Sequence, residues 1–155
     1  DISATSHTKG NEPTKIISGV SRAVGNESNC WESDGISENG ESIALKLGQK
    51  KKISQIRVTF NPNLNQEIMI KWSTQWNKTL HKQKEVKHMP LELVRDYTVK
   101  VFSGEETVFE RTVKDNIERI AVIDTEGETA GDRVVLEIHS TYGSRNASVF
   151  EIRVY

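Results

Sequence analysis

Apolar and polar side chains alternate in short runs along most of this chain, which is the pattern of β-strands with one buried face. The clearest run closes the sequence at 148–155, where apolar residues alternate with charged ones from Phe150 onward. A strand at a chain end stays ordered only when it pairs within a sheet. Similar runs, separated by turn residues, recur upstream. The pattern predicts strands at 42–47, 53–60, 68–73, 93–102, 107–113, 119–124, 133–140 and 148–155.

About eight short strands in succession predict an all-β domain, an antiparallel β-sandwich of the jelly-roll kind. No segment with helical periodicity is long enough to cross over between parallel strands, which argues against an α/β fold. Residues 1–40 carry little strand pattern and are rich in glycine, and 74–90 is a polar, basic stretch. Long ordered loops at one end of a rigid sandwich are a common place for binding sites.

Composition narrows the class of protein further. The 155 residues are the size of one domain, so 1–155 is expected to be a single unit with its own core. A net charge of -1 gives no general attraction to nucleic acid or to an anionic membrane. No apolar stretch approaches the ~20 residues that span a bilayer, so no membrane insertion is expected. Because the sequence begins at Asp1 without a methionine, we expect a processed protein or a domain excised from a larger one.

Several motifs occur in a characteristic order along the chain. They are Ile16-Ile17-Ser18-Gly19, Trp31-Glu32-Ser33, the apolar strand 43–48 that ends in Leu-Gly, the strand 53–60, the run 119–122 and the ending 151–155. Together they resemble the discoidin or coagulation-factor type C family, a galactose-binding-like jelly roll that includes many carbohydrate-binding modules. More narrowly, 19–22 and 93–97 resemble the domain attached to some bacterial FAD-dependent oxidoreductases.

The resemblance also bears on metal binding. Members of the family often hold a structural calcium ion with an aspartate where this chain has Ser18, and Glu151 stands at the family's C-terminal ligand position. Calcium favours anionic oxygen ligands, so the loss of that carboxylate weakens the site. Ser18 and Glu151 are therefore weak calcium candidates, and no other cofactor is expected in this domain.

Seven residues are candidates for ligand binding. Trp31 offers a flat face on which a sugar ring can stack, although its Trp-x-Ser context favours a buried anchor for the first loop. Trp76 lies in a polar stretch and is the best candidate for an exposed aromatic, with a folded-back plug as the alternative. The fold could bring five polar or aromatic loop residues to the same rim, where they would bind sugar hydroxyls or simply hold loop backbone: Arg22, Asn29, Asp34, Tyr142 and Arg145.

Signals for catalysis and for transition metals are weak. His81 and His88 lie seven residues apart among lysines, which is too wide for a zinc site without further ligands. Cys30 has no base next to it in the sequence and is expected to fill a small buried space. A nucleophile elbow, a P-loop and a dinucleotide fingerprint are all missing from the sequence. We therefore expect that this domain is not itself an enzyme.

Two functions follow as hypotheses. In the first, the domain is a non-catalytic carbohydrate-binding module of a larger bacterial protein that is secreted or periplasmic, with a glycan as its partner. In the second, it packs against an FAD-dependent oxidoreductase or mediates oligomerisation and binds no ligand of its own. The parent chain would be a glycoside-active enzyme in the first case and a flavoenzyme in the second.

Overall fold

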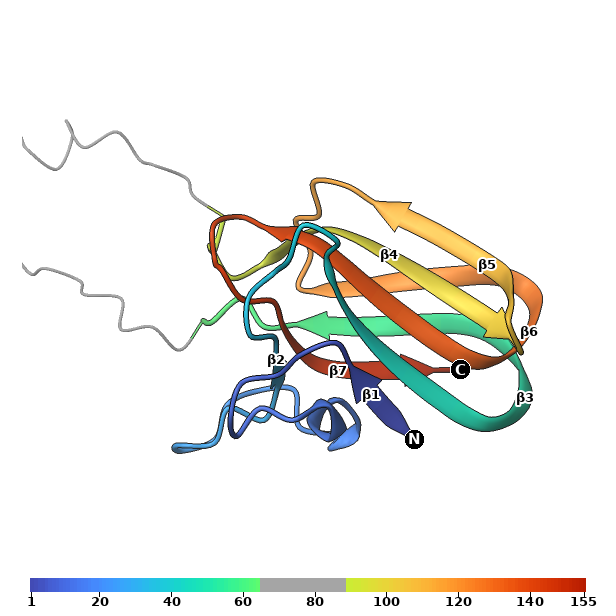
Figure 1. Ribbon diagram of the computed structural model, residues 1–155, viewed down its shortest axis with the longest axis horizontal. Helices are drawn as coiled ribbons and strands as arrows, with labels where there is room; N and C mark the ends of the chain where they lie inside the picture. Colours follow the sequence, from blue (N-terminus) through green and yellow to red (C-terminus); the bar gives the residue numbers. More distant parts are fainter. Residues whose placement is uncertain (65–88) are drawn as a thin grey trace, which may run out of the picture.

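The computed structural model describes residues 1–64 and 89–155, except for the side chains of 126–128, and it shows an all-β fold (Figure 1). The predicted fold class is therefore confirmed. The elements are β1 (Ile2–Ala4), a 3₁₀ helix η1 (Pro13–Ile17), β2 (Trp31–Glu32), β3 (Glu41–Phe60), β4 (Val94–Ser103), β5 (Glu106–Val113), β6 (Ile120–Thr141) and β7 (Ser148–Val154). In this described part no helix has the length and hydropathy needed to cross a membrane.

Two strands are much longer than the sequence pattern predicted. The predicted strands 42–47 and 53–60 are two halves of β3, and 119–124 and 133–140 fall within β6. In place of the turn expected after Gly48, β3 bends and stays paired with β6. Lys51 pairs with Gly131, and Lys52 pairs with Ala130. The prediction of separate strands was wrong here, since charged turn-like residues can remain paired where two strands bend together. The predicted strand 68–73 lies outside the described residues.

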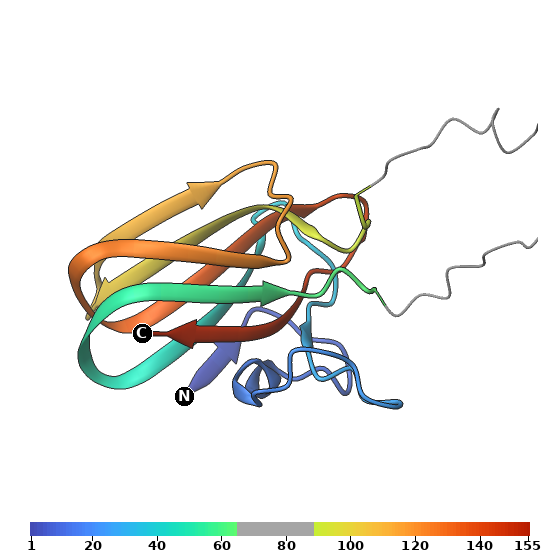
Figure 2. The same ribbon diagram turned by 180° about the vertical axis from the view of Figure 1, so that it is seen from behind.

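Bending places β3 and β6 in both layers of the sandwich. All pairings are antiparallel, and the strand order is β2-β7-β3-β6-β4-β5, with β1 also on β3. The second half of β3 and the first half of β6 lie with β7 and β2, and the other halves lie with β1, β4 and β5 (Figures 1 and 2). The bends gather at one end of the molecule and the long loops at the other.

Alternating apolar residues from the two layers meet in one core. Along β3 the side chains of Ile56, Val58 and Phe60 are buried, as the period-two pattern predicted. The Phe60 ring meets the Tyr97 ring of the opposite layer with centroids 5.1 Å apart and planes tilted by 56°. This tilted arrangement suits the quadrupoles of two aromatic rings. Burial raises the pKa of the Tyr97 hydroxyl to about 12.

The last strand departs from strict alternation. A β-bulge interrupts its pairing with β3, because Thr59 pairs with Glu151 whereas Phe60 pairs with Val149. The bulge brings Val149 and Ile152 into the core cluster and leaves Phe150 outside it, where the Arg119 guanidinium lies 5.7 Å from its ring centroid. A bulge inserts one residue and so shifts which side chains face inward. Phe150 is buried, as the pattern predicted, but it does not join the core cluster that contains Ile152.

Trp31 fastens the long first loop to the sandwich. Its side chain is 0% exposed, and the indole N–H donates to the Ser6 carbonyl oxygen over 2.9 Å. Ser33, also fully buried, joins this loop to Ala147 twice. The Ser33 N–H donates to the Ala147 carbonyl and the Ala147 N–H donates to the Ser33 hydroxyl, both over 2.9 Å. The Trp-x-Ser element thus closes two loops onto one another at the same end of the molecule.

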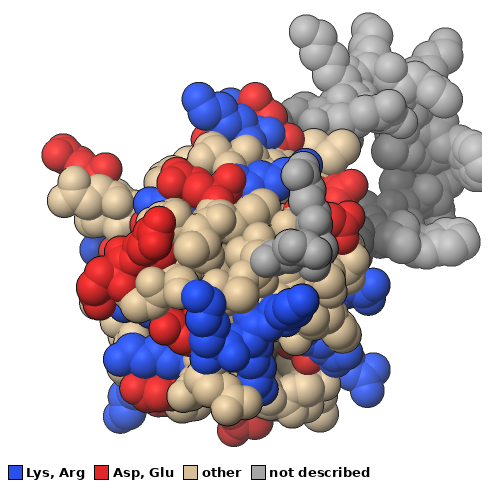
Figure 3. All heavy atoms as spheres, turned by 90° about the vertical axis from the view of Figure 1, so that its right-hand side faces the viewer, with Lys and Arg blue, Asp and Glu red and all other residues tan. Residues whose placement is uncertain are grey.

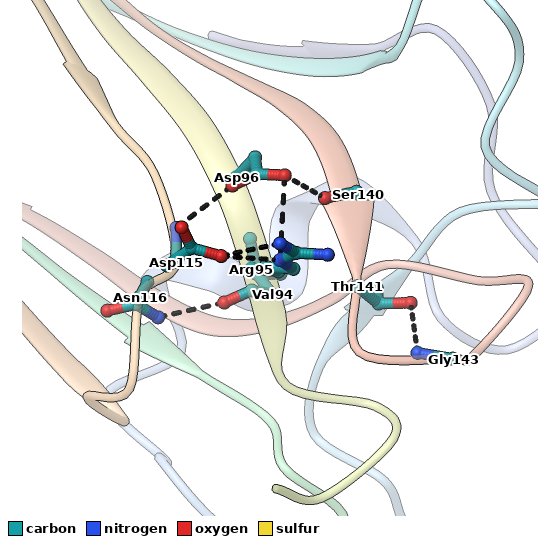
Figure 4. Close-up of polar contacts among 8 residues, drawn as sticks. All are labelled: Val94, Arg95, Asp96, Asp115, Asn116, Ser140, Thr141 and Gly143. Carbon is teal, nitrogen blue, oxygen red and sulfur yellow. Dashed lines mark hydrogen bonds and ion pairs between the residues drawn. The ribbon is translucent and has the colours of Figure 1, made fainter.

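A polar network holds the start of β4 against its neighbours (Figure 4). Arg95 Nη2 lies 2.6 Å from the Asp115 carboxylate, the Asp115 N–H donates to Asp96 over 2.9 Å, and the Ser140 hydroxyl donates to Asp96 over 2.5 Å. The hydrogen bond from Ser140 lowers the pKa of the Asp96 carboxyl below its ordinary value, against the opposing effect of partial burial. β4, β6 and the loop between β5 and β6 are joined through this one carboxylate.

Charge is uneven over the surface. Figure 3 shows the bend end of the sandwich, where lysine and arginine side chains gather beside a group of acidic ones. Lys50, Lys51 and Lys52, three consecutive exposed residues at the bend of β3, belong to this end. The long loops lie at the opposite end, so these lysines are remote from them (Figure 1).

Replacing Trp31 by alanine should destabilise the protein by about 3–5 kcal/mol, because it removes a large buried ring and leaves a cavity. Urea denaturation followed by circular dichroism measures this change. Val108→Ala on β5, where the side chain is 38% exposed, serves as the control and should change stability by less than about 0.5 kcal/mol. A Trp31→Ala protein as stable as the control would show that the loop does not depend on this anchor.

The Asp96 network should make stability depend on pH in the acid range. A carboxyl whose pKa is lowered by folding adds stability that is complete above its unfolded pKa, about 3.9, and lost as pH falls through the folded value. We therefore expect Asp96→Asn to be less stable than wild type at pH 7 and the gap to close below about pH 4. Urea titrations across this range test it, and Ser140→Ala should reduce the gap. A difference in stability between wild type and Asp96→Asn that stays constant down to pH 2.5 would contradict the role assigned to the Asp96 carboxylate.

Candidate functional site

A cavity of about 330 Å³ opens at the loop end of the sandwich. Four segments line it: the loop before β2, the chain just after β3, the chain just before β4, and the loop that leads into β7. Most of the lining side chains are amides, hydroxyls or carboxylates. The lining residues are Ala23, Ser28, Cys30, Glu32, Asn61, Asn63, Glu92, Ser144, Asn146 and Ser148.

Asn61 and Ser148 form one side of the cavity with Cys30. The Asn61 amide donates to the Ser148 hydroxyl over 3.1 Å, and that hydroxyl donates to the Cys30 sulfur over 3.2 Å. Cys30 is buried, as the sequence predicted, but one side of it borders the cavity. These contacts hold the end of β3 beside the start of β7, because the Asn61 N–H also donates to the Ser148 carbonyl over 3.0 Å.

Asn146 and Glu32 form a second group in the lining. The Asn146 amide donates to Glu32 Oε1 over 2.8 Å, and its oxygen accepts the Gly35 N–H over 3.0 Å. Glu32 Oε2 also accepts a longer contact of 3.5 Å from the Asn11 amide. The amides of Asn146 and Asn11 thus hold distant loop segments to the Glu32 carboxylate. Because these donors are neutral, they do not cancel the negative charge of Glu32 at the cavity wall.

Asn63 turns the chain at the cavity mouth. Its backbone φ of 53° lies in the left-handed region, which asparagine adopts more readily than most residues. The Asn63 N–H donates to the Asn61 side-chain oxygen over 2.9 Å, and the Asn63 amide donates to Glu92 Oε1 over 3.1 Å. The chain that leaves β3 therefore meets the chain that enters β4 at this point.

A smaller hollow of about 40 Å³ adjoins the main cavity and shares Ala23 and Asn61 with it. Its other lining residues combine apolar and guanidinium groups: Arg22, Pro62, Leu64, Arg119 and Phe150. Of the residues proposed from sequence, Arg22 is therefore placed beside the site, at the edge of this hollow rather than in the main cavity.

The other proposed residues that the structure describes do not line the main cavity. Trp31 is buried as an anchor, so its ring is closed to a ligand. The Asn29 amide donates to the Arg22 carbonyl over 3.2 Å and supports that loop. Asp34 is exposed, and its backbone N–H donates to the Ser6 hydroxyl over 3.0 Å. Trp76 lies outside the described residues.

Tyr142 and Arg145 flank the loop that leads into β7. Tyr142 is half-buried against the core, with the Arg95 guanidinium 5.8 Å from its ring centroid. Arg145 is exposed and lies across Gly35, where an added Cβ would come 3.3 Å from its Nε. Tyr142 and Arg145 therefore stay predictions, and the residues of this loop that face the cavity are their neighbours Ser144 and Asn146.

Sequence reasoning missed Glu32, Asn61 and Asn146, which line the cavity. One signal was available for Asn61, because it follows directly on the strand 53–60 at the end where the loops gather. Glu32 was read only as the middle of the Trp-x-Ser motif. Its side chain is directed to the cavity because its neighbours Trp31 and Ser33 are both buried, and strand side chains alternate.

The residues proposed for calcium have other contacts. The Ser18 hydroxyl accepts the Val20 N–H over 3.3 Å, and Glu151 Oε1 lies 2.8 Å from Arg153 Nε. Across residues 1–64 and 89–155 no three His, Cys, Asp or Glu side chains converge to hold a metal ion. His81 and His88 lie outside the described residues.

The arrangement of the cavity suits a ligand with many hydroxyl groups. A sugar hydroxyl donates and accepts at once, and amides, hydroxyls and carboxylates satisfy both needs. Within the described lining no aromatic side chain is present, so the expected stacking contact is not among these residues. Hydrogen bonding is therefore the main chemistry that this part of the site can offer.

Comparisons with known proteins give structural neighbours only. No family model and no curated protein match the sequence. A fucose-binding module of Streptococcus pneumoniae, SpX-3, has a TM-score of 0.67 at 12% identity, with 100% of this chain and 92% of that chain covered. The family 32 carbohydrate-binding module of NanJ from Clostridium perfringens, solved with galactose, has a TM-score of 0.65 at 18% identity over 99% of this chain and 91% of its own.

A third neighbour is chitosan-binding module 2 of a chitosanase/glucanase from Paenibacillus sp. IK-5, solved with chitotriose. Its TM-score is 0.68 at 16% identity, and the match covers 100% of this chain and 95% of the module. The narrower resemblance to a domain of FAD-dependent oxidoreductases stays a prediction. The galactose-binding-like jelly roll is confirmed, since the described part of this chain has the fold of these carbohydrate-binding modules.

Proposed function

We propose that this chain is a non-catalytic glycan-binding module and that the cavity at the loop end is its binding site. The polar cavity of about 330 Å³ carries the proposal, because its volume and its amide, hydroxyl and carboxylate lining suit a sugar. The fold adds support, since the neighbours named above are described as binding fucose, galactose or chitosan-derived sugars.

The cavity is preorganised for such a ligand. Its walls come from four segments joined by hydrogen bonds that do not require a ligand, such as Asn61 to Ser148 and Asn146 to Glu32. A site whose side chains are already held in place loses little conformational entropy on binding. Glu32 retains acceptor capacity, because a carboxylate has about four acceptor positions and only two contacts to it are present among the described residues.

We further propose that the module belongs to a larger bacterial protein that is secreted or periplasmic, where polysaccharide ligands occur. Binding is calcium-independent in this proposal, because the carboxylate at Glu151 is paired with Arg153 and Ser18 supplies no charge. The neighbours support a role as an appended module, since one of them comes from a chitosanase/glucanase. Catalysis would then reside elsewhere in the parent chain.

Titration with a panel of neutral and acidic mono- and disaccharides should give saturable binding for at least one sugar. Trp31 lies between the lining residues Cys30 and Glu32, so intrinsic tryptophan fluorescence can report occupancy, with calorimetry as a second readout. Glu32→Gln removes the charge and keeps the shape, and it should weaken binding about tenfold, since a hydrogen bond to a charged group contributes about 1.5–3 kcal/mol.

Glu110→Gln is the matched control, because Glu110 is exposed on β5 and does not line the cavity. This variant should bind as wild type does. Each titration is repeated with calcium and with a chelator, and equal affinities are expected. An affinity unchanged in Glu32→Gln would place the sugar elsewhere, and the absence of binding across the whole panel would refute the proposed function.

A further inference from the structure

We propose that the small hollow beside the cavity binds an acidic substituent of the glycan, a carboxylate or a sulfate ester, between Arg22 and Arg119. This inference rests on the proposed function and names the class of glycan: an acidic sugar rather than a purely neutral one. It adds to the site an arginine, Arg119, that the sequence did not single out. Three observations carry it.

The first observation is that the two guanidinium groups of the hollow are not neutralised. Neither Arg22 nor Arg119 lies within 4.0 Å of a carboxylate in the part of the chain that the structure describes. Arg95 provides the contrast, since its guanidinium is paired with Asp115 at 2.6 Å (Figure 4). Arg22 and Arg119 both line the hollow, so an anion placed there meets two positive charges that no carboxylate neutralises.

The second observation is that Arg119 is held in place but incompletely bonded. Its Nη2 donates to the Ser21 carbonyl over 2.5 Å, and its guanidinium lies 5.7 Å from the Phe150 ring centroid. Its Nε is buried and has no hydrogen-bond partner. A buried donor without a partner is costly, so the Arg119 side chain gains free energy if it shifts to meet an acceptor in the hollow that this residue lines. Arg119 is thus an ordered cation beside the hollow with one unsatisfied donor.

The third observation is the size and position of the hollow. Its volume of about 40 Å³ is far below the about 330 Å³ of the main cavity, so it suits a small substituent rather than a sugar ring. It shares Asn61 with the main cavity, which lies directly beside it. A ring in the cavity can therefore extend a charged substituent into the hollow, where an arginine fork suits a carboxylate.

The main cavity and the small hollow differ in the charge of the residues that line them. The described lining of the main cavity includes no lysine or arginine but does include Glu32, so an anion is disfavoured there. The three consecutive exposed lysines, Lys50 to Lys52, lie at the bend end of the sandwich (Figure 1). In the part of the chain that the structure describes, the hollow places two arginines beside the cavity wall, which gives the acidic group a defined position.

Arg133 is a matched control that the chain itself provides. Its Nε is also buried without a partner, and its guanidinium lies 4.4 Å from the Phe102 ring centroid. It does not line the hollow or the cavity. Any general effect of an anion on buried arginines would act on Arg133 as well, whereas an effect of the proposed site is confined to Arg119 and Arg22.

The test is a titration of protein labelled with ¹⁵N-arginine, with the Nε–Hε signals followed by nuclear magnetic resonance. The probes are galacturonate and galactose 6-sulfate, with galactose as the neutral counterpart. We expect a saturable shift of the Arg119 signal with an acidic probe, no comparable shift with galactose, and a constant Arg133 signal. The two acidic probes distinguish a carboxylate from a sulfate ester.

Variants complete the test with affinity as the readout. Arg22→Gln and Arg119→Gln should each weaken the acidic probe about tenfold or more and leave galactose unchanged, while Arg133→Gln and Lys51→Gln alter neither. Arg22 is exposed, so its variant should fold even where Arg119→Gln does not. An Arg119 signal that stays constant with both acidic probes, or that shifts equally with galactose, overturns the inference. Loss of neutral-sugar binding in Glu32→Gln would still uphold the glycan-binding function in that case.

Discussion

The pairing of β3 with β6 is the constraint on which the rest of the structure depends. These two strands remain partners from Glu41 and Ile138 at one end of the ladder to Thr59 and Ile120 at the other, and they cross together from one layer to the other. Every other strand joins an edge of this ladder or extends it. Each layer contains one half of β3 and one half of β6. The position of one layer relative to the other is therefore set by these continuous strands as well as by the packing of the core.

This arrangement places the long loops of the described chain at one end. The bends occupy the end opposite the loops. The chain segments before β2, after β3, before β4 and before β7 therefore meet at one rim of the sandwich, where they line one cavity. The Trp31 anchor and the double hydrogen bond between Ser33 and Ala147 then fix two of these loops to each other. A polar cavity results because loop backbone and loop side chains must satisfy one another where the core ends.

The fold could be predicted from the sequence, because period-two alternation survives in the structure. Ile56, Val58 and Phe60 show this directly, and the Trp-x-Ser motif marked a real anchor. The number of strands could not be predicted. Exposed lysines such as those in β3 have the same sequence pattern whether the chain makes a turn there or bends while its strand stays paired with a neighbour. The place of the buried Phe150 outside the core cluster could not be predicted either, because a one-residue bulge leaves no signal in hydropathy.

The site was harder to predict than the fold. The residues proposed from sequence lie in loops, and which side chains of a loop face the cavity depends on individual backbone angles within it. Arg145 and Asn146 are adjacent, and only Asn146 lines the cavity. Trp31 was weighed as a ligand platform because an indole has the same chemistry whether buried or exposed. Burial by Ser6 and the loop around it is a tertiary property that a local pattern does not contain.

The contact between Asn63 and Glu92 has a consequence for the entrance of the cavity. It joins the chain just after β3 to the chain just before β4, at the mouth of the cavity. A side-chain hydrogen bond at this place fixes the spacing of the two chain segments directly. The mouth of the cavity therefore keeps its width through residues next to the sandwich, and a substitution of Asn63 would alter the entrance without touching the core.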